Sequence, residues 1–346
     1  MNVNEKLIRK VFDQMVKHRK TLSKYLILDE DDEDEEDEVD YRILGDLLIK
    51  NFPWPIGIEL RRLFSGSMRE YDRMRLDQIF KTIERTIQFI SFVMLSQLWK
   101  EKNSGKLEIP ESFSKDFPQR FGVLSMGNFS WIIRSVTNIF NDNEVVWFMP
   151  EMGEEFDKKF LAALDFWVPE RNEIGHYQIN LTQEDIEKRL VEYEEKLTFI
   201  LEKISFLAKY KLVSVKQINV MKPKNQEPRF HHVMDMLNSS DSDFKAKEMD
   251  EENYCDSNSV ILMKTIKTID EYINLSPLII DTSGEIIDTK DKFKVKKDIF
   301  LYTKIRGDQL FYIGTEVTEK VDLRPLTNYD NLVSEYKDLV SAIAGQ

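Results

Sequence analysis

The residues whose types and spacing could carry out a reaction lie between Arg171 and His176. An arginine offers N–H donors in a flat fork that matches a phosphate, and a histidine exchanges a proton near neutral pH. Asn172 precedes His176 by four positions, so on a helix both side chains share one face and the amide can orient the imidazole. This combination predicts acid–base chemistry on a phosphodiester.

Pro169 suggests where the helix that carries these residues begins. Proline suits the first position of a helix, so we expect Glu170 and Arg171 in the first turn. A phosphate there would meet free backbone N–H groups and the positive end of the helix dipole. Arg171 and His176 are five positions apart, which separates them by roughly 140° around an ideal helix. Either Gly175 distorts the turn, or two copies meet in a dimer and share the two side chains.

The order Arg171, Asn172, then His176 after a gap of four residues resembles the signature of the HEPN family. The resemblance implies an α-helical bundle that forms a homodimer and acts as a metal-independent endoribonuclease. Arg171 would bind the scissile phosphate, Asn172 would position the site, and His176 would move the proton of the 2′-hydroxyl or of the leaving oxygen. The products would carry a 2′,3′-cyclic phosphate and a 5′-hydroxyl, and no cofactor or metal would take part.

The same resemblance implies a biological setting. Such proteins are often cytoplasmic toxins or anti-phage defence effectors, with RNA as substrate and a defence-system or antitoxin partner. The segment 52–57, Phe-Pro-Trp-Pro-Ile-Gly, also resembles part of bacterial defence proteins that carry HEPN-like modules.

Two other interpretations of the motif stay open. In the first, the chain is a non-catalytic HEPN-like dimerisation or interaction module that recruits or regulates a defence partner. Arg171 would then pair with Glu170 or Glu173, and Arg171 and His176 would be buried. In the second, the chain is the helical half of a nucleotidyltransferase system, and a tyrosine such as Tyr177 is modified by a separate partner.

Long amphipathic helices should position the motif. Apolar residues at helical spacing predict helices over residues 5–25, 41–50, 70–100, 121–140, 154–166 and 183–210. Thr182 and Asp185 are suited to cap the last of these. On that helix Arg189 and Lys196 would contact RNA, unless they only form its solvated side. Residues 51–57 contain two prolines and should form an extended apolar turn, with Phe52, Trp54 and Ile56 plugging the bundle.

At about residue 212 the pattern changes from helical to alternating. Strands are predicted over residues 213–220, 259–263, 275–280, 298–302 and 309–313, with a hairpin turn at 306–308 and a closing helix over about 332–343. Residues 238–258 should form a loop. The sequence therefore predicts an α+β protein: a HEPN-like helical domain, residues 1–212, followed by a small β-rich domain, residues 213–346, that senses or positions a partner.

Composition limits the remaining possibilities. Eleven of the twelve residues 29–40 are acidic, and removing these eleven charges from the net charge of −13 leaves −2, so a locally basic RNA groove is allowed. This run should be a loop insertion that either only solvates or covers the motif until RNA displaces it. No apolar run is long enough to span a membrane and the start lacks a signal peptide, so we expect a cytoplasmic protein.

The other residues with chemical potential give no site. Cys255 is the single cysteine, which excludes an internal disulfide, and its polar neighbours favour an incidental thiol over a nucleophile. His231 and His232 are adjacent in an extended segment, so they should point to opposite faces and not share a metal ion.

Overall fold

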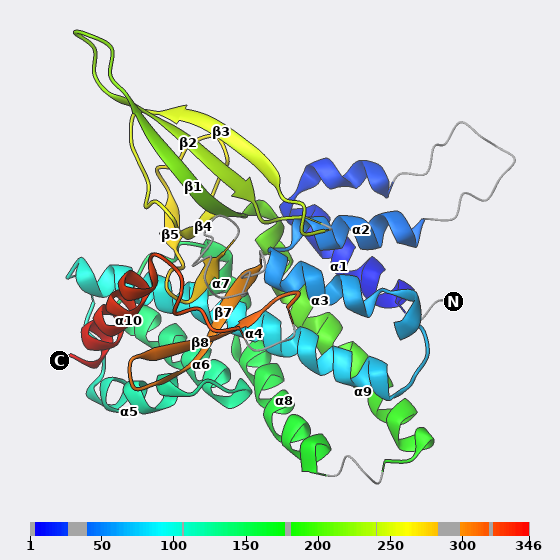
Figure 1. The fold of residues 1–346 in the computed structure, drawn as a ribbon. Coiled ribbons are helices and arrows are strands. Elements are labelled where there is room, and N and C mark those ends of the chain that lie inside the picture. The colour runs from blue at the N-terminus through cyan, green and yellow to red at the C-terminus, as the bar shows by residue number, and fades with distance from the viewer. Residues whose placement is uncertain are drawn as a thin grey trace, which may run out of the picture. The chain divides into compact units, whose positions relative to one another are not determined.

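The computed structural model describes residues 4–26, 40–105, 107–176, 181–239, 241–282, 298–317 and 321–345, leaving aside the side chains of residues 174–176. These residues form an α+β protein, as predicted, with antiparallel strand pairs in the C-terminal part of the chain (Figure 1). They divide into two compact units. The helical unit comprises residues 1–86, 154–211 and 238–243, and the mixed unit comprises the remainder.

The helical unit contains the elements around the motif. Its members are α1 (Glu5–His18), η1 (Lys20–Tyr25), α2 (Tyr41–Asn51), α3 (Trp54–Leu63), η2 (Gly66–Met68), the first part of α4 (Arg73–Asn103), α8 (Lys158–His176), α9 (Gln183–Lys203) and η3 (Ser205–Lys209). Helix α1 packs on α2, α9 and η3, with Val11, Phe12 and Met15 fully buried. The predicted helices are thus present, although the first and last each end in a 3-10 turn.

The apolar segment after α2 is more helical than predicted. Only Phe52 and Pro53 separate α2 from α3, because Pro55 lies in the first turn of α3, where the missing N–H has no helical partner to lose. Phe52, Trp54 and Ile56 are buried, as predicted. The two helices approach closely at Gly57, where an added Cβ would lie 2.7 Å from the carbonyl oxygen of Ile49.

The insertion expected at residues 29–40 falls almost wholly on residues 27–39, which lie outside the described part of the chain. Asp40 itself is the N-cap of α2, and its carboxylate accepts the backbone N–H of Arg42 at 2.8 Å. The acidic run therefore ends where a helix begins, and a carboxylate is favourable at that end of the helix dipole.

The mixed unit combines helices with two sheets. Its helices are the second part of α4, α5 (Glu111–Gly122), α6 (Met126–Asp142), most of α7 (Pro150–Glu155) and α10 (Tyr329–Ala344). Residues 87–153 were predicted to be part of the helical domain, but in the structure they lie in the mixed unit together with the strands. The reason is packing: Gln88 donates to the carbonyl oxygen of Tyr302 at 3.0 Å, and the Phe121 ring stacks on Tyr336.

Two helix starts in this unit differ from the prediction. Helix α5 begins at Glu111, between the predicted helices 70–100 and 121–140, because Phe113, Phe117 and Phe121 recur every four residues and bury one face. Helix α6 begins at Met126, and its N-cap is Ser125, whose hydroxyl accepts the N–H of Asn128.

The strands form a five-stranded sheet in the order β3-β2-β1-β4-β5 and a three-stranded sheet in the order β6-β7-β8. Their bounds are β1 (Lys211–Met221), β2 (Arg229–Met236), β3 (Lys245–Glu251), β4 (Val260–Met263), β5 (Tyr272–Asn274), β6 (Ile279–Asp281), β7 (Ile299–Arg306) and β8 (Gln309–Gly314). The predicted hairpin between β7 and β8 is present, with Gly307 at φ +58° in its turn. Strand β3 lies within the expected loop, and its charged residues suit the edge position that it takes beside β2.

The chain on either side of residues 283–297 is held together at its two ends. The backbone N–H of Thr282 donates to the carbonyl oxygen of Asp298 at 3.2 Å. The Asp298 carboxylate in turn accepts the backbone N–H groups of Glu316 and Val317 at 2.9 and 2.8 Å, and the hydroxyl of Thr315. Asp298 thereby joins the start of β7 to the segment after β8.

Candidate active site

Helix α8 carries the motif, but it begins well before Pro169. Its first residue is Lys158, and the Asp157 carboxylate accepts the backbone N–H of Phe160 at 2.8 Å. This hydrogen bond is the largest cause that holds the pKa of Asp157 below its usual value. The prediction that Pro169 starts the helix is therefore wrong. The buried residues Phe160, Leu164 and Trp167 fix the helix before Pro169, and the helix continues beyond the proline, which removes only one helical N–H.

This correction changes the electrostatics of the motif. Arg171 lies in the last turns of α8, where backbone carbonyl oxygens give the helix dipole its negative end. A phosphate there would find no free N–H groups of a helix start, so the predicted helix-start phosphate seat is absent at Arg171. A cation is instead favourable at this end, and any anion must be held by side chains.

Arg171 and Asn172 are accessible from solvent. The Arg171 side chain is 48% exposed, and its Nη2 lies 3.7 Å from Glu84 Oε1 on α4. Asn172 is exposed on the next position of α8. The backbone of α8 remains helical through His176, but the side chain of His176 lies outside the described residues, as does Tyr177.

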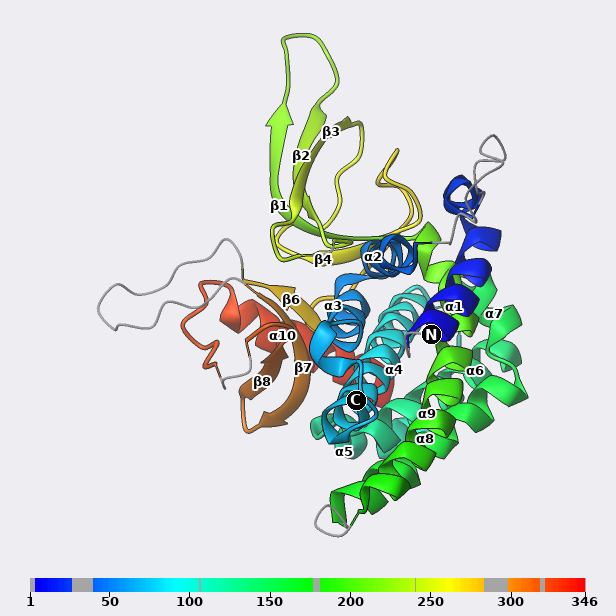
Figure 2. The same cartoon turned by 90° about the vertical axis from the view of Figure 1, so that its right-hand side faces the viewer.

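Glu170 and Glu173 do not hold Arg171 but pair with Arg189 of α9. Arg189 Nη1 lies 3.2 Å from Glu170, and Nη2 pairs with Glu173. The Tyr193 hydroxyl donates to Glu170 and accepts a hydrogen bond from Arg189. The bond to Tyr193 is the largest cause that raises the pKa of Arg189, and burial raises the pKa of Tyr193. This network ties α8 to α9, which lie side by side in Figures 1 and 2.

The second residue predicted to contact RNA, Lys196, is also engaged. Its Nζ lies 5.1 Å from the centroid of the Phe166 ring, within the range of a cation–π interaction. Beneath this pair, the Trp167 ring packs edge-on against Phe80 and tilted against Tyr193, at centroid distances of 5.6 and 5.5 Å. The structure thus brings Arg189 and Lys196 to the α8–α9 contact rather than to a separate groove.

The capping prediction for α9 is confirmed. The Thr182 hydroxyl accepts the backbone N–H of Asp185 at 3.2 Å, and the Asp185 carboxylate accepts the backbone N–H of Thr182 at 3.2 Å. This reciprocal pair satisfies two of the N–H groups that a helix start leaves unpaired. It fixes the start of α9 and, through Arg189, the end of α8.

The helical unit contains a buried charged residue, Arg75, that the sequence analysis did not predict. The Arg75 guanidinium is fully buried in α4, and its Nε donates to Glu194 of α9 at 2.5 Å. Its other donors reach the carbonyl oxygen of Met68 at 2.6 Å and Asn4 Oδ1 at 2.9 Å. Tyr71 donates to the second oxygen of Glu194 at 3.0 Å. The signal was weak, since Arg75 is one of several basic residues near the start of α4.

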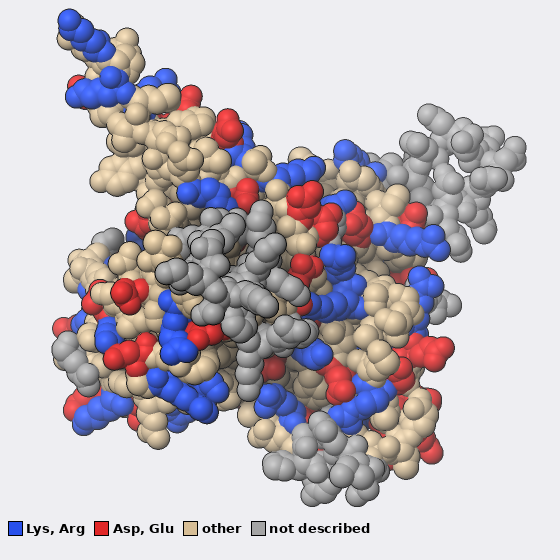
Figure 3. Space-filling model, viewed as in Figure 1, with Lys and Arg blue, Asp and Glu red and all other residues tan. Residues whose placement is uncertain are grey.

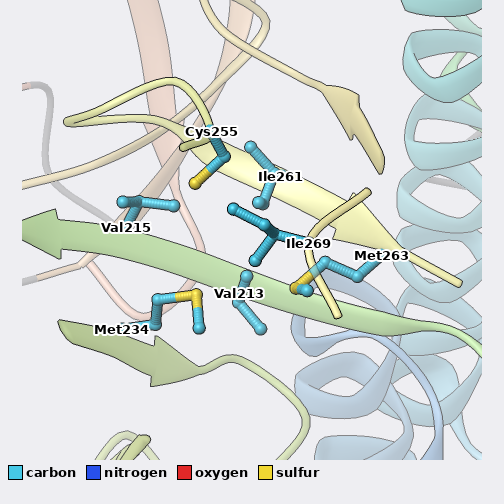
Figure 4. Packing of buried hydrophobic residues seen from close by; sticks show 7 residues of the cluster. All are labelled: Val213, Val215, Met234, Cys255, Ile261, Met263 and Ile269. Atoms are coloured by element: carbon cyan, nitrogen blue, oxygen red, sulfur yellow. The ribbon is translucent and has the colours of Figure 1, made fainter. Parts of the chain in front are cut away.

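The structure places Cys255 in a core and the two adjacent histidines on opposite faces of β2. Cys255 is 3% exposed and packs in the core cluster with Val213, Met234 and Ile261 (Figure 4). Burial, with a smaller contribution from a neighbouring aspartate, raises the pKa of its thiol to about 11, which disfavours the nucleophilic thiolate. His232 is fully buried in β2 whereas His231 faces Asp250 at 2.7 Å, so the predicted opposite orientation is confirmed.

The surface of the helical unit is mixed in charge on the face drawn in Figure 3, with basic and acidic side chains interspersed. Within the described ranges, no helix is both long and apolar enough to cross a membrane. The same ranges hold no group of three or more His, Cys, Asp or Glu side chains that could bind a metal ion. Comparison with family models, curated proteins and solved structures gives no match to this chain.

Proposed function

We propose that the helical unit is a HEPN-like, metal-independent endoribonuclease that acts as a homodimer, with Arg171, Asn172 and His176 as its catalytic residues. The observation that carries this proposal is the solvent exposure of Arg171 and Asn172 on a helix whose other face is fixed in the core. Among the described residues Arg171 forms an ion pair with Glu84 alone, at 3.7 Å, and such an exposed pair is weak enough for the guanidinium to bind a phosphate in its place.

The geometry of α8 is the reason why we propose a homodimer. Because α8 stays helical through His176, the five-residue spacing keeps Arg171 and His176 roughly 140° apart. In one copy the two residues would then lie on different sides of the helix. A two-fold axis near the end of α8 would bring Arg171 of one copy beside His176 of the other, so that both contact one phosphodiester.

The chemistry follows from these side-chain types. The 2′-oxygen of the RNA attacks the phosphorus, the bond to the 5′-oxygen breaks, and the products end in a 2′,3′-cyclic phosphate and a 5′-hydroxyl. His176 takes the proton of the 2′-hydroxyl or supplies the proton that the leaving oxygen needs. Arg171 stabilises the negative charge on the phosphate oxygens. In a toxin or anti-phage effector this reaction would act on cellular or phage RNA, and the mixed unit would sense or position a defence or antitoxin partner.

The decisive experiment incubates purified protein with structured and unstructured RNA in EDTA. We expect cleavage with cyclic phosphate ends, and a loss of about 10²-fold or more in rate for His176→Ala and Arg171→Ala. Arg42→Ala and His231→Ala are matched controls, since each removes the same residue type at a position distant in sequence from the motif, and both should cleave at the wild-type rate. Sedimentation should show a dimer for every variant.

The nuclease proposal fails if dimeric wild-type protein leaves both RNAs intact, or if the motif variants cleave as fast as the controls. The first of these outcomes would favour the second candidate, a dimerising interaction module. The exposure of Arg171 contradicts the burial expected for that candidate, but one observation favours it: Glu84, Glu170 and Glu173 lie around the motif and would repel a phosphate. Such a module would retain its dimer and its defence partner when Arg171 is replaced.

A further inference from the structure

A cavity of about 520 Å³ opens in the mixed unit, between the last turns of α4, the strand β5 and helix α10. Its lining residues all belong to this unit, and its volume lies in the range of sites that hold small molecules. The motif residues of α8 do not line it. It therefore calls for an explanation separate from the nuclease proposal.

Two carboxylates, those of Asp256 and Glu335, lie in the polar part of this cavity. Glu335 of α10 accepts the hydroxyl of Ser276 at 2.5 Å, and Asp256 accepts the amide of Asn274 at 2.9 Å. A carboxylate can accept about four hydrogen bonds, so each retains capacity for a ligand. Burial raises the pKa of Glu335, the hydrogen bond from Ser276 opposes this shift, and the negative charges of Asp256 and Asp338 add to it.

A buried hydroxyl adds an independent indication of a ligand. Ser96 of α4 is only 3% exposed and lines the cavity, yet its Oγ has no hydrogen-bond partner within the described residues. A buried polar atom without a partner costs free energy that a bound polar group would recover. Trp99, one turn along α4, supplies an aromatic wall of the same cavity.

The charge of the lining selects the sign of the ligand. Lys100 is the basic residue among the lining side chains, and its Nζ donates to the carbonyl oxygen of Tyr272 at 3.2 Å. With Asp256 and Glu335 ionised, the lining carries a net charge of −1. An anion would meet two carboxylates, whereas a cation would compensate them, and a cation also interacts favourably with an indole face.

We propose that this cavity binds a small organic cation, a primary ammonium on an aliphatic chain, whose N–H groups contact Glu335 and Asp256 and whose methylene groups pack against Trp99. A rotation of the Ser96 side chain toward the cavity would allow its unpartnered hydroxyl to accept a further N–H from the ligand. The mixed unit is thereby assigned a small-molecule site that is independent of the helical unit's motif.

Isothermal titration of the full chain with 1,6-hexanediamine tests this site, with 1,6-hexanediol as a neutral probe of the same length. We expect one saturable site for the diamine, no binding of the diol, and an affinity at least tenfold lower for Glu335→Gln. Glu227→Gln removes an equal charge from an exposed loop of the same unit and should leave the affinity unchanged. If Glu335→Gln does not fold by circular dichroism, Asp256→Asn, at an exposed position, replaces it with the same expected loss.

Three results would overturn the proposal. The first is the absence of saturable diamine binding, and the second is binding of the diol as strong as that of the diamine. The third is diamine binding that persists unchanged in the Glu335 or Asp256 variant, as attraction to the acidic residues 29–40 would give.

Discussion

Replacing Arg75 with methionine should destabilise the helical unit more than replacing a partly exposed charged residue such as Arg73. Methionine retains most of the aliphatic length of arginine but removes the donors to Glu194, Met68 and Asn4. Because Arg75 is fully buried and the Glu194 side chain is only 13% exposed, the carboxylate would be left in the core without its cation.

The magnitude follows from this burial. Removing one partner of a buried ion pair costs about 3–5 kcal/mol, because the remaining charge keeps its desolvation penalty. Tyr71 still donates to Glu194, which places the expected loss near the middle, at about 4 kcal/mol. Domains of this kind are stable by about 5–15 kcal/mol, so this loss would be a large fraction of the total.

Urea unfolding followed by circular dichroism measures the loss, and Arg73→Met is the matched control. Arg73 forms a partly exposed pair with Asp77, so its replacement should cost at most about 1 kcal/mol. The double variant Arg75→Met with Glu194→Gln should lose less than the sum of the single variants, since no uncompensated charge remains. A loss below about 1 kcal/mol for Arg75→Met would refute the reasoning.

The pH dependence of this loss has a definite sign. Burial raises the pKa of Glu194 above its usual 4.5, while Arg75 opposes this shift. A carboxyl with a raised pKa in the folded state contributes stability below about pH 4.5 that is lost as pH rises through the folded pKa. The destabilisation by Arg75→Met should therefore be smaller at pH 4, where Glu194 is protonated in both proteins, than at pH 8.

Two further predictions concern packing. Cys255 should react with a thiol reagent at pH 8 only after unfolding, because the thiol is buried with a pKa of about 11, and rapid labelling of the native protein would contradict its placement in the core. Gly57→Ala should lower the free energy of unfolding by about 1–3 kcal/mol, since the new Cβ meets the Ile49 carbonyl oxygen at 2.7 Å. Gly66→Ala, with nothing within 4 Å of its Cβ, should lose far less in the same urea titration, and equal losses would exclude the clash as the cause.

Regular apolar spacing made most elements predictable from the sequence. The periodic series in α1, α4 and α9 located these helices, and the alternating residues of β1, β7 and β8 located these strands. One error came from Pro169, which was predicted to start a helix. Pro118 lies inside α5, where Phe117 and Phe121 are buried on either side of it, and Pro169 lies inside α8 after the buried Phe160, Leu164 and Trp167. In each helix the proline removes only one helical N–H.

Contacts between residues that are distant in sequence could not be predicted from local sequence patterns. The sequence predicted Arg189 to be a surface cation that could bind RNA. In the structure α8 packs beside α9, and Arg189 forms ion pairs with Glu170 and Glu173 of α8. The pairing of Arg75 could likewise not be predicted from the sequence, because its partner Glu194 lies 119 positions further along the chain. The lining of the cavity comes from four separate segments, around residues 96–103, 256–259, 272–276 and 335, so no local motif marks it.

The hydrogen bond between Thr282 and Asp298 has a consequence for protein engineering. Since the chain on both sides of residues 283–297 is joined at this point, lengthening that segment would not move either strand end. Doubling the length of a closed loop costs only about 0.6 kcal/mol in chain entropy. An epitope tag or a fluorescent label grafted there should be carried without loss of the sheet, and would report on the protein in cells while both termini stay unaltered.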